Sequence, residues 1–92
     1  MMKIPAYIAE LVGTFAFVLV ILSSGGNAYI IGAALAIVIL LIGSISGGHV
    51  NPAVSFSMFV KGSMTPMEFA TYAVAQIIGG LGAVYAYKMV SA

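Results

Sequence analysis

The stretch SGGHVNPAV, residues 46–54, lies in the middle of an otherwise apolar chain. Glycine is costly inside a helix, and proline ends or kinks one. Asn51, however, is a favoured residue just before a helix, and Pro52 suits the first helical position. The stretch therefore predicts that one helix ends before Gly47 and that a new helix begins at Pro52.

The composition of the whole chain indicates a membrane protein. The 92 residues are 63% hydrophobic and 5% charged, with a mean hydropathy of +1.22. Soluble domains are about one quarter charged, and a chain this short cannot bury so much apolar surface. The absence of cysteine excludes a disulfide framework. The net charge of +1 gives no reason to expect a nucleic-acid partner. We expect an all-α, multi-pass integral protein of the cell membrane, in contact with the lipid bilayer.

Three apolar runs are long enough to cross the bilayer, at about 6–23, 28–45 and 67–89. Each approaches the roughly 20 residues that a spanning helix needs. The first run lacks a small-residue cleavage site, so it is not expected to be a cleaved signal. Thr65, Pro66 and Glu68 have the spacing of a capping box and predict the start of the third span.

Residues 46–61 are predicted to form a re-entrant loop and a half-helix. A helix over 52–60 would be about 13 Å long, less than half of a hydrocarbon core of about 30 Å. It has no charged face, which argues against a helix lying on the membrane surface. Its N-terminus would place a positive dipole end near the midplane, opposing cations. With the Asn51 amide as donor and the carbonyls of Gly47, Gly48 and His49 as acceptors, the pattern favours a pore for small neutral molecules.

Three motifs together resemble the aquaporin and glycerol-facilitator family, the major intrinsic proteins. The loop resembles that family's first NPA loop. AELVGT at 9–14 resembles its first-helix motif, and AQIIG at 75–79 resembles its third-helix motif. The resemblance covers nearly the whole chain but only the first, N-terminal repeat of a family member. Members of that family are built from two inverted repeats, so the resemblance implies one aquaporin-like repeat over 1–92.

The resemblance implies a role for each matching residue. Asn51 would be one of two pore asparagines, while Pro52 and Ala53 would pack against the loop of the other repeat. Glu10 and Gln76 would be buried supports of the loop. An acid within a span needs partners, which agrees with this role for Glu10. Its alternative is an interfacial charge near a helix end. The lone histidine predicts no metal site and the sequence implies no cofactor.

Two departures concern the narrow filter of the family. The position that follows the motif is Val54 here, and the chain contains no arginine. The second-helix filter position falls on Ile31, where the family commonly has an aromatic residue. The filter is therefore expected to be apolar and less selective, with water or a small polyol as the permeant. Because the chain has no cysteine, mercury reagents are expected not to block it.

Several assemblies are compatible with one repeat. Lys3 and Lys61 fall on one side and Lys88 on the other, a weak bias that permits insertion in both orientations. We expect an antiparallel homodimer that forms a passive channel, with a fourfold cluster beyond it. Met1 and the finished third span lead us to expect a complete unit. The alternatives are a half that needs a separate second-repeat chain, a non-conducting fragment, or a small structural membrane protein. No acyl-transfer motif accompanies the serines and the histidine, so no enzyme is predicted.

Overall fold

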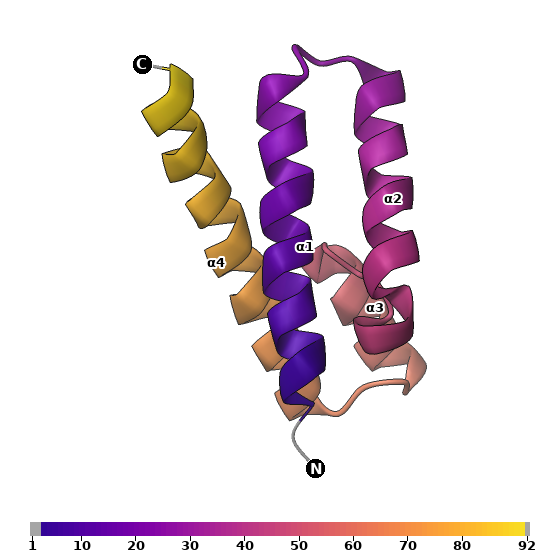
Figure 1. Cartoon of the computed structure of the whole chain (residues 1–92). Coiled ribbons are helices and arrows are strands. Elements are labelled where there is room, and N and C mark those ends of the chain that lie inside the picture. The colour runs from indigo at the N-terminus through magenta and orange to yellow at the C-terminus, as the bar shows by residue number, and fades with distance from the viewer. Residues whose placement is uncertain (1–2, 92) are drawn as a thin grey trace.

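The computed structural model describes residues 3–91, so the ends of the predicted 1–92 unit lie outside the described residues. This part of the chain is all helical. The helices are α1 (Ile4–Ser23), α2 (Ala28–Ser46), α3 (Pro52–Lys61) and α4 (Pro66–Ser91). The prediction of an all-α protein with three long apolar helices and one short helix is confirmed (Figure 1).

The three long helices form a slab in which α1 lies between α2 and α4 (Figure 1). All three are long and apolar enough to cross a membrane. At Gly79, the backbone of α4 lies directly against the backbone of α1. A Cβ atom added there would clash with the Leu11 carbonyl oxygen and lie 3.1 Å from the Phe15 nitrogen. The absence of a side chain at this position therefore permits the two backbones to meet.

Helix α2 is the least enclosed of the three. Only 6% of the residues in its apolar spanning stretch are buried, compared with 28% in the corresponding stretches of α1 and α4. Its N-terminus is capped by Asn27, whose side chain accepts hydrogen bonds from the backbone nitrogens of Tyr29 and Ile30. The helix is thus well formed locally, although it presents most of its surface outward.

Helix α4 begins with the predicted capping box. The Thr65 backbone nitrogen donates to Glu68 Oε1 at 2.9 Å, and the Glu68 nitrogen donates to Thr65 Oγ1 at 3.1 Å. The other carboxylate oxygen, Oε2, lies 3.1 Å from Lys3 Nζ. This ion pair joins the start of α4 to the start of α1, so both helices begin at the same end of the molecule.

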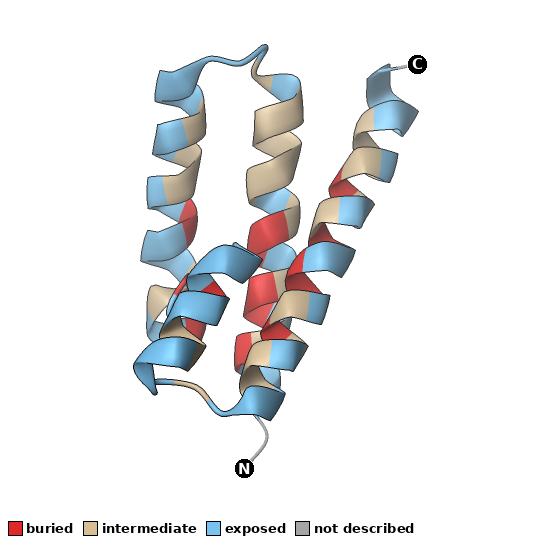
Figure 2. Cartoon of the chain, turned by 180° about the vertical axis from the view of Figure 1, so that it is seen from behind, coloured by how far each residue is buried: buried red, intermediate tan, exposed pale blue. Residues whose placement is uncertain are grey.

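Helix α3 occupies only one half of the molecule. The chain leaves α2 at the end where α1 begins, turns back to about mid-height, and descends again through α3 (Figure 1). Its 10 residues correspond to about 15 Å, half of a typical hydrocarbon core. Buried residues concentrate in this same half of the molecule (Figure 2). The best-packed region therefore surrounds the re-entrant loop.

Candidate functional site

The loop between α2 and α3 is fixed from behind by the carboxylate of Glu10. This side chain is fully buried, with 0% exposure. Its Oε2 atom accepts from Ser46 Oγ at 2.6 Å and from the His49 backbone nitrogen at 3.0 Å. Its Oε1 atom accepts from the Val50 nitrogen at 2.8 Å and from Gln76 Nε2 at 2.9 Å. A buried carboxylate is tolerable because four donors replace its water shell.

These bonds hold an unfavourable backbone conformation. Val50 has φ of 44°, a left-handed value that is rare for a β-branched residue. Such a residue costs on the order of 1–3 kcal/mol and persists only where its surroundings fix it. The bond to Glu10 and the burial of the Val50 side chain supply that constraint. Gly47 and Gly48 also have positive φ, at 92° and 65°, which glycine adopts readily. The loop therefore contains three residues with positive φ.

A second set of hydrogen bonds joins the loop to α3 and α4. Gln76 Nε2 donates to Ser55 Oγ at 2.9 Å, and Ser55 Oγ lies 2.8 Å from His49 Nδ1. Tyr72 donates its hydroxyl to the Ser46 carbonyl at 2.7 Å, and its ring lies against His49 with centroids 5.0 Å apart. Residues from α1, α2, α3 and α4 thus meet in one buried polar network behind the loop.

The front of the loop faces a cavity of about 280 Å³. Apolar side chains of α1, α2 and α3 form one part of its wall, and residues of the loop form the other part. The lining residues are Phe17, Leu35, Ile39, Gly48, His49, Val50, Asn51 and Val54. Asn51 Oδ1 accepts from the Ala53 nitrogen at 2.8 Å and caps α3. The exposed side chain therefore keeps its NH₂ group available as a donor at the rim of this cavity.

The structure distributes the predicted site residues over both sides of the loop. Glu10 and Gln76 lie in the buried network at the rear. Pro52 and Ala53 are exposed at the start of α3, and Gly47 caps α2 outside the cavity lining. Ile31 also lies outside that lining. Its spacing from Leu35 and Ile39, however, puts all three on one stripe of α2.

Some residues of this site were not predicted from the sequence. At the rear these are Ser46, Ser55 and Tyr72. At the front they are Phe17, Leu35 and Ile39. The last two could have been found by counting four and eight residues forward from Ile31 along a helix. The serines offered no comparable signal, because Ser57 in the same half-helix is exposed and bonds only its own helix.

The site consists of hydrogen-bond donors and acceptors and not of the usual metal-binding side chains. Within residues 3–91 no group of three His, Cys, Asp or Glu side chains is placed to hold a metal ion. Its features are instead a helix N-terminus, an available amide and an apolar wall. That combination suits the passage of small polar molecules past a few fixed hydrogen-bonding groups.

Comparison with known proteins identifies the same family. A family model described as Major intrinsic protein matches residues 1–92. Aquaporin-8 of Mus musculus is 35% identical over 94 residues, covering 91% of this chain and 36% of that protein. Glycerol uptake facilitator protein-like 6 of Lactiplantibacillus plantarum is 36% identical over 90 residues, covering 89% of this chain and 42% of that protein.

A third relative, Aquaglyceroporin AqpS of Rhizobium meliloti, is 31% identical over 89 residues. The match covers 80% of this chain and 38% of that protein. The chain therefore spans about two fifths of the length of these curated relatives, between 36% and 42%. Together with three apolar helices of spanning length, the match makes the chain a multi-pass integral membrane protein. It belongs to the major intrinsic protein family.

Proposed function

We propose that two copies of this chain, inserted in opposite orientations, form a passive channel for water or small neutral solutes. The observation that carries this proposal is the Asn51 amide, which is available at the rim of a cavity with an apolar wall. Water or a hydroxyl passing Asn51 would accept a hydrogen bond there while its other side meets Phe17 and Leu35. The carbonyls of Gly48 and His49, which line this cavity, are the proposed acceptors along the same path, and that of Gly47, outside the lining, is proposed to extend them.

The direction of α3 supports a preference for neutral permeants. Helix N-termini carry a partial positive charge, and Asn51 stands at the N-terminus of α3. Facing a narrow path, this end would disfavour cations and protons while leaving neutral molecules unaffected. The buried bonds of Glu10 and Gln76 support the proposal that these two residues hold the loop and do not touch the permeant.

The exposed residues at the front of the loop favour a second repeat that covers them. Asn51, Pro52, Ala53 and Val54 are all exposed in the single chain. Polar groups left unsatisfied in lipid cost several kcal/mol each. A partner loop, with the same groups in the inverted orientation, would cover them. Opposite insertion is feasible because the ends of the bundle carry Lys3 and Lys61 against Lys88, a bias of only one charge.

In this dimer the filter would consist of two copies each of Ile31 and Val54. Both are aliphatic, and the sequence has no arginine to add a fixed charge. Water is the permeant we propose first, and small polyols such as glycerol come next. A fourfold cluster of these dimers is the proposed higher assembly. The channel is passive, so no enzymatic step is proposed.

The test is osmotic shrinkage of proteoliposomes that contain only this chain, followed by stopped-flow light scattering. The matched pair of variants is Asn51→Asp and Asn27→Asp. Both asparagines cap helices through Oδ1, and aspartate keeps that acceptor. Only Asn51→Asp, however, would replace a donor of the proposed pore with a negative charge. We expect rapid shrinkage for the wild type and for Asn27→Asp, and a clear change for Asn51→Asp.

Shrinkage equal to that of empty vesicles, with the chain inserted and folded, would contradict the proposal. It would instead favour a half that needs a separate chain carrying the second repeat, or a piece without transport of its own. Rapid shrinkage at the same rate in the wild type and in both variants would indicate a leak unrelated to the loop, as expected for a small structural membrane protein.

A further inference from the structure

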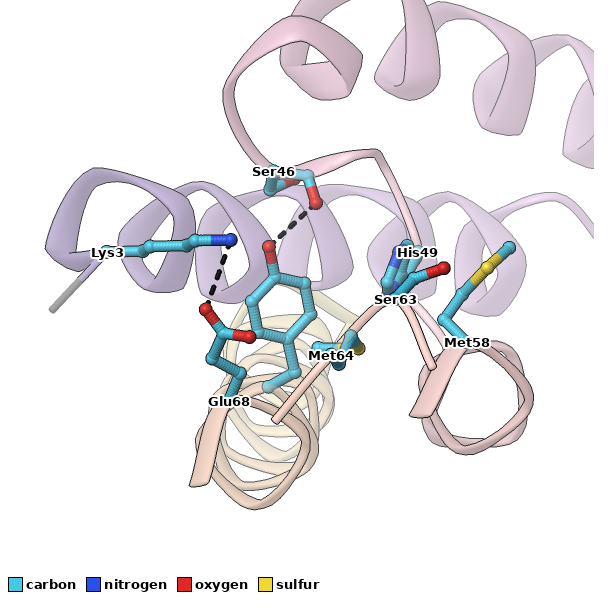
Figure 3. A pocket seen from close by; sticks show the side chains of 8 residues that line it. Lys3, Ser46, His49, Met58, Ser63, Met64 and Glu68 are labelled. Atoms are coloured by element: carbon cyan, nitrogen blue, oxygen red, sulfur yellow. Dashed lines mark hydrogen bonds and ion pairs between the residues drawn. The ribbon is translucent and has the colours of Figure 1, made fainter. Parts of the chain in front are cut away.

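A smaller pocket of about 120 Å³ is lined in part by Ser46 and Tyr72 of the network behind the loop, and it shares only His49 with the lining of the Asn51 cavity. The ion pair of Lys3 and Glu68 forms part of its lining, at the end of the molecule where α4 begins (Figure 3). The side chains of Met58, Met64 and His49 line it together. Figure 3 shows the two methionines on either side of His49 in that view. Two thioethers and an imidazole thus share one small space.

We propose that Met58, Met64 and His49 form a binding site for a soft monovalent metal ion, with Cu(I) as the biological candidate. Thioether sulfur and imidazole nitrogen are ligands that copper accepts, whereas harder cations prefer oxygen. The lone histidine had predicted no metal site, because the sequence showed no second ligand for it. The structure supplies the missing ligands from a different class, the thioethers.

The histidine is oriented for this role. His49 Nδ1 lies 2.8 Å from Ser55 Oγ. Among the hydrogen bonds of residues 3–91, none uses Nε2. In the tautomer whose Nδ1–H donates to Ser55, Nε2 would present a lone pair to a ligand. Histidines that bind metals usually donate their other ring N–H to an oxygen acceptor, which fixes the ring. Ser55, held in turn by Gln76, would serve as that acceptor.

The charged groups at the mouth favour a soft ion over a hard one. Glu68 is the carboxylate of the pocket, and both its oxygens are occupied. Oε1 accepts from the Thr65 nitrogen at 2.9 Å, while Oε2 pairs with Lys3 at 3.1 Å. A hard cation would have to break these contacts to gain a carboxylate ligand. Because Lys3 is paired with Glu68, its charge is largely compensated, so a monovalent ion meets little net repulsion.

A bound ion would join three separate segments. His49 belongs to the loop, Met58 to α3, and Met64 to the connection between α3 and α4. Coordination would tie the rear of the loop to the far end of the half-helix. His49 also lines the Asn51 cavity, whereas Met58 and Met64 do not, so the ion would bind on the side of His49 that faces the methionines. We therefore expect binding to stabilise the folded state, by an amount that grows with the logarithm of the ion concentration once this exceeds the dissociation constant.

The experiment uses Ag(I) nitrate as a redox-stable probe, titrated into the purified chain in nanodiscs by calorimetry in chloride-free buffer. Thiols cannot contribute, since the chain has no cysteine. The pocket variant is Met58→Leu with Met64→Leu, which nearly conserves side-chain volume. The matched control is Met67→Leu with Met89→Leu, two methionines that are 71% and 83% exposed and lie outside the pocket lining.

We expect one saturable ion per chain for the wild type and the control, and binding at least about tenfold weaker for the pocket variant. Absence of saturable binding, or equal weakening in both variants, would overturn the site. Should the pocket variant lose its helical circular dichroism, methyl-labelled methionine NMR of the wild type decides. Two of the six methionine methyls should then shift with Ag(I), and no shift would overturn the proposal. Neither measurement depends on conduction, so this site and the proposed channel stand or fall separately.

Discussion

The rear and the front of the re-entrant loop are built in opposite ways. Behind the loop, Glu10, Gln76 and Ser55 are 0–2% exposed and bonded to one another or to the loop backbone. In front of it, Asn51 and Val54 are exposed beside an apolar cavity. The rear pairs most of its polar groups within one chain, although Gln76 Oε1 is buried there without a hydrogen-bond partner. The front leaves its groups open.

This difference separates two tasks that one short segment must perform. The rear stabilises an irregular backbone at membrane depth, because side chains of α1 and α4 form hydrogen bonds with its polar groups. The front needs a surface that remains available to something outside the chain. Substitutions at the rear should therefore change stability first, and substitutions at the front should change transport while the fold survives.

Removing the carboxylate at the rear should have the largest effect. Glu10→Ala leaves the backbone nitrogens of His49 and Val50 without their acceptor, and Gln76 Nε2 keeps only its bond to Ser55. At about 1–3 kcal/mol for each orphaned buried group, we expect a loss of roughly 4 kcal/mol or more. The measurement is the midpoint of SDS-induced unfolding followed by circular dichroism. The control is Glu68→Ala, an acid at the bundle end, which should shift the midpoint far less. Equal shifts would refute the central role of the rear network.

The close approach of α1 and α4 gives the second test, with adjacent glycines as a matched pair. Gly79→Ala would drive a Cβ into the Leu11 carbonyl oxygen, and we expect a loss of about 1–3 kcal/mol from overpacking. Gly80→Ala meets only Val18 Cγ2, at an ordinary 3.9 Å. Because alanine favours helix over glycine, Gly80→Ala should be neutral or stabilising. The same SDS titration measures both variants, and a destabilising Gly80→Ala with a tolerated Gly79→Ala would show that the contact is misplaced.

The sequence predicted the elements of this fold well, because they depend on local patterns. Runs of apolar residues marked the three long helices, and Asn51 with Pro52 marked the start of α3. The capping box at Thr65 and Glu68 also lies where its spacing indicated. Each of these signals lies within one continuous stretch of the sequence.

The rear of the loop was harder to predict, because its bonds join distant residues. Ser46 and Gln76 reach Glu10 across 36 and 66 positions of the chain. The resemblance proposed Glu10 and Gln76 as supports, but nothing local distinguished Ser55 from Ser57. The left-handed Val50 was also unexpected, since a β-branched residue has no intrinsic preference for that conformation.

Asn51→Ala tests how much the front of the loop contributes to the stability of the fold. We expect a smaller loss of stability than for Glu10→Ala or Gly79→Ala. The substitution removes the bond from the Ala53 nitrogen, so we expect a loss of about 1 kcal/mol, typical of an N-cap. Asn27→Ala removes the corresponding bonds at α2 and should cost a similar amount. The two should nevertheless differ in vesicle shrinkage, with only Asn51→Ala altering the rate. A loss at Asn51 as large as that at Glu10 would mean that the front is also part of the folding core.

Val54→Ala should have the smallest effect on stability and isolates the function of the front. Val54 is 36% exposed and lines the Asn51 cavity, so shortening it leaves little buried void. We expect a change within about 0.5 kcal/mol. The shorter side chain would widen the proposed path, so glycerol entry into proteoliposomes should rise relative to water. Val60→Ala is the control, because Val60 is also exposed on α3 but lies outside the cavity lining. An unchanged ratio of glycerol to water in Val54→Ala would remove Val54 from the filter while leaving the role of Asn51 intact, because the two residues affect different properties of the path.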